Sequence, residues 1–187
     1  MIKPTRKMIW HFFERTKNHI ELVEKWYNLI MKQYSEIPRI PIENHDLSKF
    51  AEPEYTPYIF TTWSYYCKRK GIDYEIPEDI KEMASEATIY HILSNPHHPE
   101  HWESNFSKTM FNAESRDDVP VKIVDATKMP NEHITELMAD WFAVAEERKT
   151  NPYDWAELNI NKRWKFTNRQ VELIYDILDN VWEKHDN

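Results

Sequence analysis

Seven side chains of metal-binding type stand in four separate stretches of the sequence: His19, His45, Asp46, His91, His97, His98 and Asp140. Neutral imidazoles and carboxylates suit Mn, Fe, Co, Ni and Zn ions, and a carboxylate beside histidines can bridge two ions. We therefore expect a site for one or two divalent transition metal ions, assembled from segments far apart in the chain. The ligand types do not select one of these metals.

The pair His45 and Asp46, in NHDLSKF, must meet a geometric condition before both residues can bind one ion. Adjacent residues on a helix point about 100° apart, so the chain has to turn here or sit at a helix end. The prolines of IPRIPIEN, immediately upstream, disfavour helix and predict such a turn. The alternative, Asp46 capping a helix beside an exposed His45, does not account for Lys49 or the later histidines.

The segment YHILSNPHHPEHW holds several further histidines. His91 and His98 are seven residues apart and would share one face of a continuous helix, which favours His98 over His97 as a ligand. Pro96 interrupts that helix, and a surface patch that binds metal only adventitiously is the alternative for His97, His98 and His101.

His19 and Asp140 also have structural alternatives. His19 could simply pack or cap on a long helix, although its position before the His-Asp pair fits a ligand. Asp140 follows a buried-type alanine and precedes Trp141, where an ionised carboxylate needs a partner. A metal ion would be such a partner, and so would Arg148 or Arg163.

Composition excludes several other kinds of site. The lone Cys67 rules out an internal disulfide and zinc-finger or iron–sulfur ligation. With Gly71 as the single glycine, no glycine-rich phosphate loop is present. The formal net charge of -8 argues against binding of extended nucleic acid. No apolar run is long enough to cross a membrane and no secretory signal is recognisable, so we expect a cytoplasmic protein.

The elements that must position these ligands are helices. Apolar residues recur at helical spacing, and prolines, Gly71 and polar caps mark the ends of each segment. Helices are expected over residues 5–34, 52–71, 77–95, 130–149, 154–159 and 168–185. Residues 114–130 form the one long loop candidate, with a short strand expected at 121–124, and Asn131 is expected to cap the helix that follows. The sequence therefore predicts one compact all-α domain over residues 1–187.

Two resemblances add to this interpretation. HDLSK resembles the His-Asp-x-x-Lys signature of the HD superfamily of metal-dependent phosphohydrolases, and HHPE is similar to the His-His-Glu element of its dinuclear members. The succession HDLSKF, YHILSNPHHPEHW, MPNEHITELMADW and NINKRWKFT also resembles a phage and bacterial family of uncharacterised proteins, from His19 to the C-terminal helix. Ser48 replaces a superfamily glycine, and the glycine-tyrosine-proline element of cyclic-dinucleotide phosphodiesterases is missing, which argues against that substrate.

The resemblance implies an HD-like fold and a role for each ligand. A first metal would be bound by His19, His45, Asp46 and Asp140, and Asp46 would bridge to a second ion. His91 and His98, with His97, would complete the second site. Lys49 would lie near a substrate phosphate.

The chemistry that such ions support is attack of an activated water on a phosphoryl group. Asp46 and Lys49 would take part in catalysis, and Glu100 would act as general base or as a hydrogen-bond acceptor behind a ligand. Arg163 and Arg169 are weaker candidates for phosphate contacts, because their position alone supports them.

We therefore expect a metal-dependent phosphohydrolase that acts on a nucleotide or another small phosphate ester in the cytoplasm, which is the host cytoplasm if the protein is phage-encoded. One alternative is an HD-type di-iron oxygenase. Another is a non-catalytic phage factor that binds a nucleotide or a protein. The abundant aromatic residues permit a homodimer without requiring one.

Overall fold

The computed structural model describes residues 3–106 and 122–184, and these confirm the expected all-α class. Six α-helices make up most of this part: α1 (Arg6–Gln33), α2 (Tyr55–Lys70), α3 (Glu78–Ser94), α4 (Asn131–Arg148), α5 (Pro152–Asn159) and α6 (Asn168–Ile177). The short elements are η1 (Ile42–Asn44), η2 (Leu47–Phe50), η3 (Pro99–Trp102), η5 (Leu178–Trp182), β1 (Val124–Asp125) and β2 (Trp164–Lys165). None of the described helices combines the length and apolarity that a membrane span requires.

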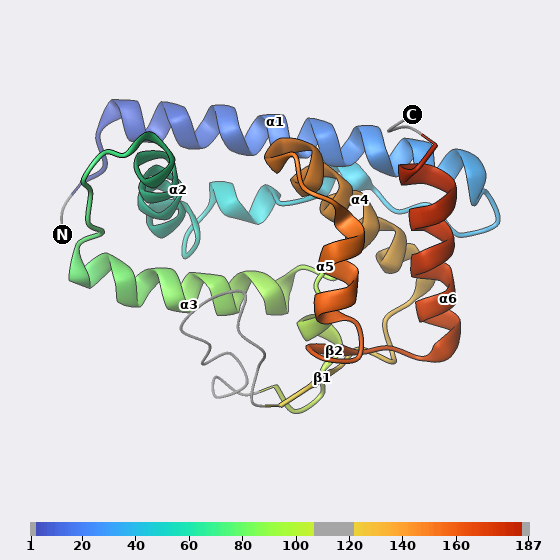
Figure 1. The fold of residues 1–187 in the computed structure, drawn as a ribbon. Helices are drawn as coiled ribbons and strands as arrows, with labels where there is room; N and C mark the ends of the chain where they lie inside the picture. The colour runs from blue at the N-terminus through green and yellow to red at the C-terminus, as the bar shows by residue number, and fades with distance from the viewer. Residues whose placement is uncertain (1–2, 107–121, 185–187) are drawn as a thin grey trace.

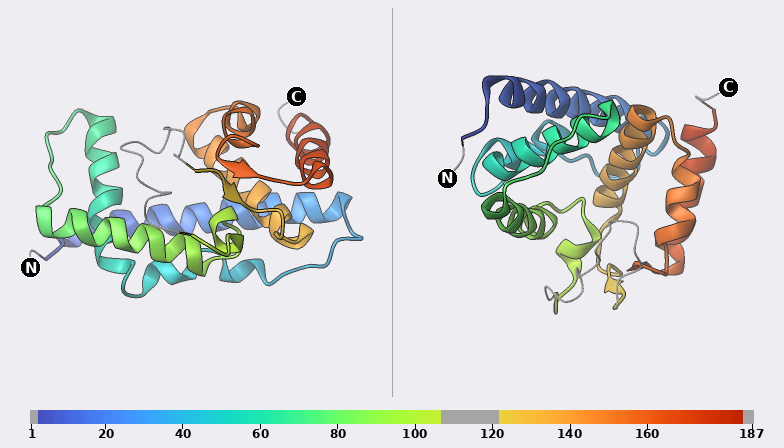
Figure 2. Two further views of the ribbon diagram at one scale, coloured as in Figure 1. Left: turned by 90° about the horizontal axis from the view of Figure 1, so that it is seen from below. Right: turned by 60° about the vertical axis from the view of Figure 1, so that its left-hand side comes forward.

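Helix α1 runs along the molecule, with α2 and α3 toward its N-terminal end and α4, α5 and α6 toward its C-terminal end (Figure 1). Its N-terminal half lies beside α2, which packs on α3, and its C-terminal half packs on α4. Helices α5 and α6 pack against α4 in turn, and the two short strands pair in parallel below α5 in the view of Figure 1; Figure 2 shows the same arrangement from two further sides. The segment that carries η1 and η2 lies between these two groups of helices.

Two separate clusters of buried apolar side chains reflect this division. Phe12 of α1 belongs to the smaller cluster, with residues of α2 and α3, whereas Val23 and Tyr27 belong to the larger one, with residues of α4, α5 and α6. Thr16 and His19 lie between them on the same helix, and both are buried although both are polar. The buried face of α1 is therefore apolar at both ends and polar in the middle.

The helix boundaries agree with the sequence-based expectations at most ends. Thr5 caps α1 by accepting a hydrogen bond from the Met8 amide, and Gly71 ends α2 with a φ of 65°. The expectation for Asn131 was wrong, because Pro130 occupies the capping position and Asn131 is already the first residue of α4. The strand expected at 121–124 overlaps β1 only at Val124, because residues 122–123 are not in a strand; residue 121 lies outside the described residues.

A buried glutamine fixes the approach to α4. Gln170 forms a reciprocal capping box with Thr167 at the start of α6, and its Nε2 donates to the carbonyl oxygen of Met129 at 2.7 Å. The same Nε2 lies 3.4 Å from the carbonyl of Ala126 and 3.3 Å from that of Thr127. One side chain thus satisfies the backbone of the turn that leads into α4.

We expect Gln170→Ala to lower the free energy of unfolding by about 1–3 kcal/mol, because buried backbone groups lose their partner. Urea unfolding followed by circular dichroism measures this change. Glu172→Ala, at an exposed position of the same helix, is the matched control and should leave stability within about 0.5 kcal/mol of wild type. Equal stability of the two variants would contradict the role given to Gln170.

Candidate metal centre

The His45 and Asp46 pair lies at a sharp turn between η1 and η2, as the sequence predicts. Asp46 adopts the left-handed conformation, with φ 60° and ψ 8°. For a residue other than glycine this conformation costs roughly 1–2 kcal/mol, although aspartate tolerates it better than most. Two backbone hydrogen bonds hold the turn, from the His45 amide to the Ile42 carbonyl and from the Lys49 amide to the Asp46 carbonyl. The turn lets two adjacent side chains enter one site.

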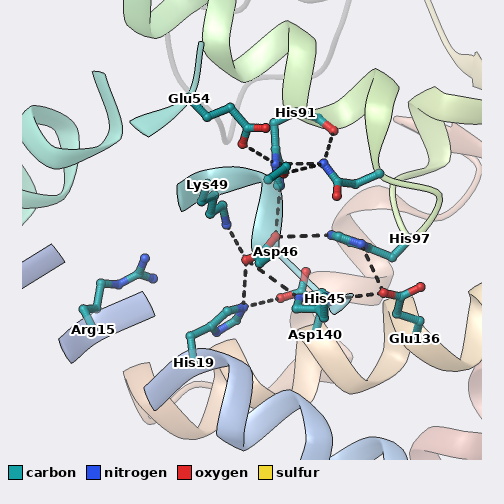
Figure 3. Close-up of polar contacts among 12 residues, drawn as sticks. Arg15, His19, His45, Asp46, Lys49, Glu54, His91, His97, Glu136 and Asp140 are labelled. Carbon is teal, nitrogen blue, oxygen red and sulfur yellow. Dashed lines mark hydrogen bonds and ion pairs between the residues drawn. The ribbon is translucent and has the colours of Figure 1, made fainter. Parts of the chain in front are cut away.

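The carboxylate of Asp46 is 1% exposed and is surrounded by four imidazoles (Figure 3). Its Oδ2 lies 3.7 Å from His19 Nε2 and 3.8 Å from His45 Nε2. Its Oδ1 lies 3.2 Å from His91 Nε2 and 3.8 Å from His97 Nε2. The two oxygens therefore divide the histidines into two pairs, which is the arrangement expected of a carboxylate that bridges two ions.

Each pair has further metal-binding groups beside it. His19, His45 and Asp140 offer ligand atoms within 4.8 Å of one another, and Asp140 Oδ1 lies 3.1 Å from His19 Nε2. His91, His97 and His98 form a second such group. With bonds near 2.1 Å, two ligand atoms of one ion are separated by roughly 3 to 3.5 Å, and the 3.1 Å between His19 Nε2 and Asp140 Oδ1 matches this spacing.

The structure places both His97 and His98 near His91, but not for the expected reason. Helix α3 ends at Ser94, so His91 and His98 do not share a face of one continuous helix. The chain bends after Pro96 and brings the His97 and His98 rings within 4.2 Å of each other, centre to centre. His97, which the helical spacing disfavoured, is the one whose Nε2 faces Asp46.

Carboxylates also face the other ring nitrogen of all four imidazoles. The Nδ1 distances are 3.6 Å from His19 to Glu147, 3.0 Å from His45 to Glu136, 2.7 Å from His91 to Glu54 and 3.4 Å from His97 to Glu136. A carboxylate near Nδ1 favours a proton on that nitrogen, and this would leave Nε2, the nitrogen on the Asp46 side, available to a metal ion. Each ring is therefore oriented as a metal ligand.

A second polar group near His91 does not disturb this assignment. The side-chain amide of Asn95 lies 3.1 Å from His91 Nδ1, but it donates to the His91 carbonyl oxygen at 2.8 Å and to Ser48 Oγ at 3.2 Å. These two hydrogen bonds use both of its protons, and His91 Nδ1 lies closer to Glu54 Oε2, at 2.7 Å, than to the Asn95 amide, although the Glu54 contact is not an aligned hydrogen bond.

The carboxylates are ionised by their surroundings. Burial alone would raise the pKa of Asp46, but Lys49 and the neighbouring imidazoles hold that pKa well below its usual value. Burial likewise opposes ionisation of Asp140, and contact with His19 outweighs it and lowers the Asp140 pKa. Ionised carboxylates are the form that binds metal.

The pKa values of His19 and His98 are shifted in opposite directions. Burial disfavours the charged form of His19, but Asp140 and Glu147 outweigh burial and raise the pKa of His19 to about 9. Burial and the nearby His97 lower the pKa of His98 well below its usual value, so His98 is a neutral imidazole.

Several buried ligand atoms lack a hydrogen bond, which tests whether a metal fits here. Among the described residues, His45 Nε2, His98 Nε2 and Asp46 Oδ1 are buried and make no hydrogen bond. Buried polar atoms without a partner are rare and costly. A divalent ion would satisfy them, so the residues present fit a metal.

Two cations accompany the ligand cluster. The Nζ of Lys49 forms an ion pair with Asp46 Oδ2 and lies 5.6 Å from the centre of the Tyr58 ring. Arg15, one helical turn before His19, lies 3.4 Å from a Glu147 oxygen. In the view of Figure 3 both cations lie on the same side of Asp46. Lys49 is thus brought to the site as expected.

Three other residues singled out in the sequence are not part of the ligand groups. Glu100 is buried in η3, where its Oε1 accepts a hydrogen bond from Trp164 Nε1 at 2.7 Å, a contact that ties η3 to β2. Arg163 packs its guanidinium over Trp164, and Arg169 is exposed in the first turn of α6. Their roles toward a substrate stay predictions.

Sequence reasoning missed Arg15 and the three outer carboxylates, Glu54, Glu136 and Glu147. Helical spacing could have found some of them. Glu136 and Glu147 stand four residues before and seven residues after Asp140 on α4, and therefore share its face. Arg15 likewise stands four residues before His19 on α1. Glu54 lies in the irregular segment before α2 and had no such signal.

Comparison with known proteins identifies a family but no characterised relative. No curated protein and no solved structure matches it. A family of unknown function (DUF5662) matches residues 8–180, a range that includes every ligand and outer carboxylate described above. The chain therefore belongs to the DUF5662 family.

Proposed function

We propose that the protein is a metal-dependent phosphohydrolase of the HD type, with two divalent ions bridged by Asp46. The observation that carries the proposal is the division of the Asp46 oxygens between two pairs of imidazoles. One ion would be held by His19, His45, Asp46 and Asp140. The other would be held by Asp46, His91 and His97, with His98 beside them.

The residues around the ligands suit a phosphate ester. When bound, the ions supply a nucleophilic water at neutral pH and offset negative charge on the phosphoryl group under attack. Lys49 is 17% exposed on its side chain and contacts Asp46, so its ammonium group can reach both the centre and an incoming phosphate. Arg15 provides a second cation in an otherwise acidic chain, and a guanidinium binds phosphate oxygens in pairs. A nucleotide or similar small phosphate ester fits this combination.

We expect tag-free protein to contain two transition metal ions per chain and Asp46→Ala to contain none, because both ion positions share this carboxylate. Elemental analysis after purification without chelator measures the content. Asp154→Ala, at an exposed position on α5, is the matched control and should keep the wild-type content. Wild-type protein that holds no metal, even after incubation with Mn²⁺, Fe²⁺ or Zn²⁺, would contradict the proposed centre.

Lys49→Met should retain both metals but lower the rate of phosphate release on the order of 100-fold, because a positioned charge is lost from the transition state. A panel of nucleoside phosphates, assayed for released phosphate with metal-loaded protein, provides the measurement. Lys17→Met replaces an exposed lysine of α1 that pairs with Glu21 and serves as the control. Hydrolysis by Lys49→Met at the wild-type rate would sink the role proposed for Lys49.

A di-iron oxygenase is the second candidate, and one observation favours it. Asp46, His91 and His97 form a two-histidine, one-carboxylate set, which is typical of non-haem Fe(II) oxygenases. For this candidate we expect protein produced with iron to contain two iron ions per chain, to develop an oxygen-dependent absorption band and to release no phosphate. Phosphate release with redox-inert Zn²⁺ would exclude the requirement for iron.

The third hypothesis, a non-catalytic binding factor, predicts that ligand binding survives Asp46→Ala and Asp140→Ala. The cytoplasmic setting and the dimer permitted by the aromatic residues also stay predictions.

A further inference from the structure

One carboxylate touches ligands from both halves of the candidate centre. Glu136 Oε1 lies 3.0 Å from His45 Nδ1 and 3.4 Å from His97 Nδ1. The two imidazole rings lie side by side, with centres 4.2 Å apart and planes inclined by 39°. His45 faces Oδ2 of Asp46 and His97 faces Oδ1, so the two rings belong to different ion positions.

The other outer carboxylates contact one imidazole each. Glu147 lies beside His19, on the Oδ2 side of Asp46, and Glu54 lies beside His91, on the Oδ1 side. Glu54 is fully buried and Glu147 is partly exposed. Because each of them faces an imidazole of only one pair, neither links the two pairs as Glu136 does. The described part of the chain therefore contains one glutamate that contacts an imidazole of each pair and two glutamates that contact one imidazole each.

Glu136 is itself held in place. Its second oxygen, Oε2, lies 3.3 Å from Nδ1 of His133, one turn earlier on α4. The ring of His133 packs near that of Trp102, with centres 5.6 Å apart. Glu136 is 6% exposed and stands one helical turn before the ligand Asp140. Because Glu136 is held in place, a rotation of the His45 or His97 ring changes the distance from its Nδ1 to the Glu136 oxygen.

We propose that Glu136 is a positioning residue that couples the two ion positions, so that the first ion bound raises the affinity for the second. The inference rests on the proposed dinuclear centre. An ion on the Oδ2 side fixes the His45 ring, and the Nδ1–H of that ring fixes the shared oxygen of Glu136. His97 then meets an ordered acceptor, and less orientational freedom is lost when the second ion binds.

As an alternative, the same residues could bind a third ion. His45, His97 and Glu136 offer ligand atoms within 4.8 Å of one another. The 3.0 Å contact of His45 Nδ1 with Glu136 is a hydrogen bond, the 3.4 Å contact of His97 Nδ1 is a longer one, and both Nε2 atoms already face Asp46. We therefore assign protons to the Nδ1 atoms. Two bound ions would agree with Nδ1–H groups that donate to Glu136, whereas three bound ions would mean that the Nδ1 atoms bind metal.

The test is a calorimetric titration of metal-free protein with Mn²⁺ alone, which reports the number of ions and both affinities. Wild type should bind two ions cooperatively. Glu147→Gln and Glu54→Gln should each weaken one of the two binding steps about 10–100-fold, the usual effect of losing an outer carboxylate. Glu136→Gln should weaken both steps and abolish the cooperativity. Glu132→Gln, on the first turn of α4, is the control for the helix.

Each other outcome overturns a stated claim. Two ions bound by wild type, with Glu136→Gln weakening one step or neither, would refute the coupling and leave the dinuclear centre intact. Binding of a third ion would refute the assignment of protons to Nδ1. No binding by wild type would refute the proposed function and the coupling together. If Glu136→Gln does not fold, as judged by circular dichroism, Glu136→Asp replaces it, with a smaller loss expected at both steps.

Discussion

The buried carboxylate of Asp46 is the group on which the arrangement of the site depends. An ionised carboxylate that is 1% exposed is costly unless charged or hydrogen-bonding groups surround it. Here those groups come from α1, from the turn itself, from α3 and from the segment after α3. Because each of these segments contributes an imidazole to one carboxylate, the position of Asp46 links elements that are far apart in the sequence.

The two apolar clusters explain how such a polar centre can exist inside a small domain. One cluster joins α1 to α2 and α3, and the other joins α1 to α4, α5 and α6. The ligand from α1, His19, lies between Phe12 and Val23, at the boundary between the clusters. Apolar packing therefore stabilises both ends of α1, and the middle of the helix can contain buried polar side chains such as His19.

The sequence was informative where periodicity or backbone chemistry determines the outcome. Apolar spacing and prolines located the helices, and the prolines before His45 predicted the turn that lets His45 and Asp46 enter one site. The helical spacing that favoured His98 over His97 does not exist in the structure, because α3 ends at Ser94, and the preference for His98 as a ligand stays a prediction. Side-chain directions in a short irregular segment depend on tertiary contacts, which a single sequence does not contain.

The charged groups around the candidate centre affect both metal binding and the attraction of a phosphate. Four imidazoles face Asp46, and five carboxylates lie close to these rings. The carboxylates are those of Asp46, Glu54, Glu136, Asp140 and Glu147. Lys49 and Arg15 are the permanent cations in contact with this set, and protonation of His19 adds a third charge only in the absence of metal. Divalent ions would offset the excess of negative charge and would displace that proton. The outer carboxylates then have a further consequence, because they reduce the net positive charge of the centre. An incoming phosphate would be attracted chiefly by Lys49, Arg15 and the exposed coordination positions of the ions, rather than by a broadly basic surface.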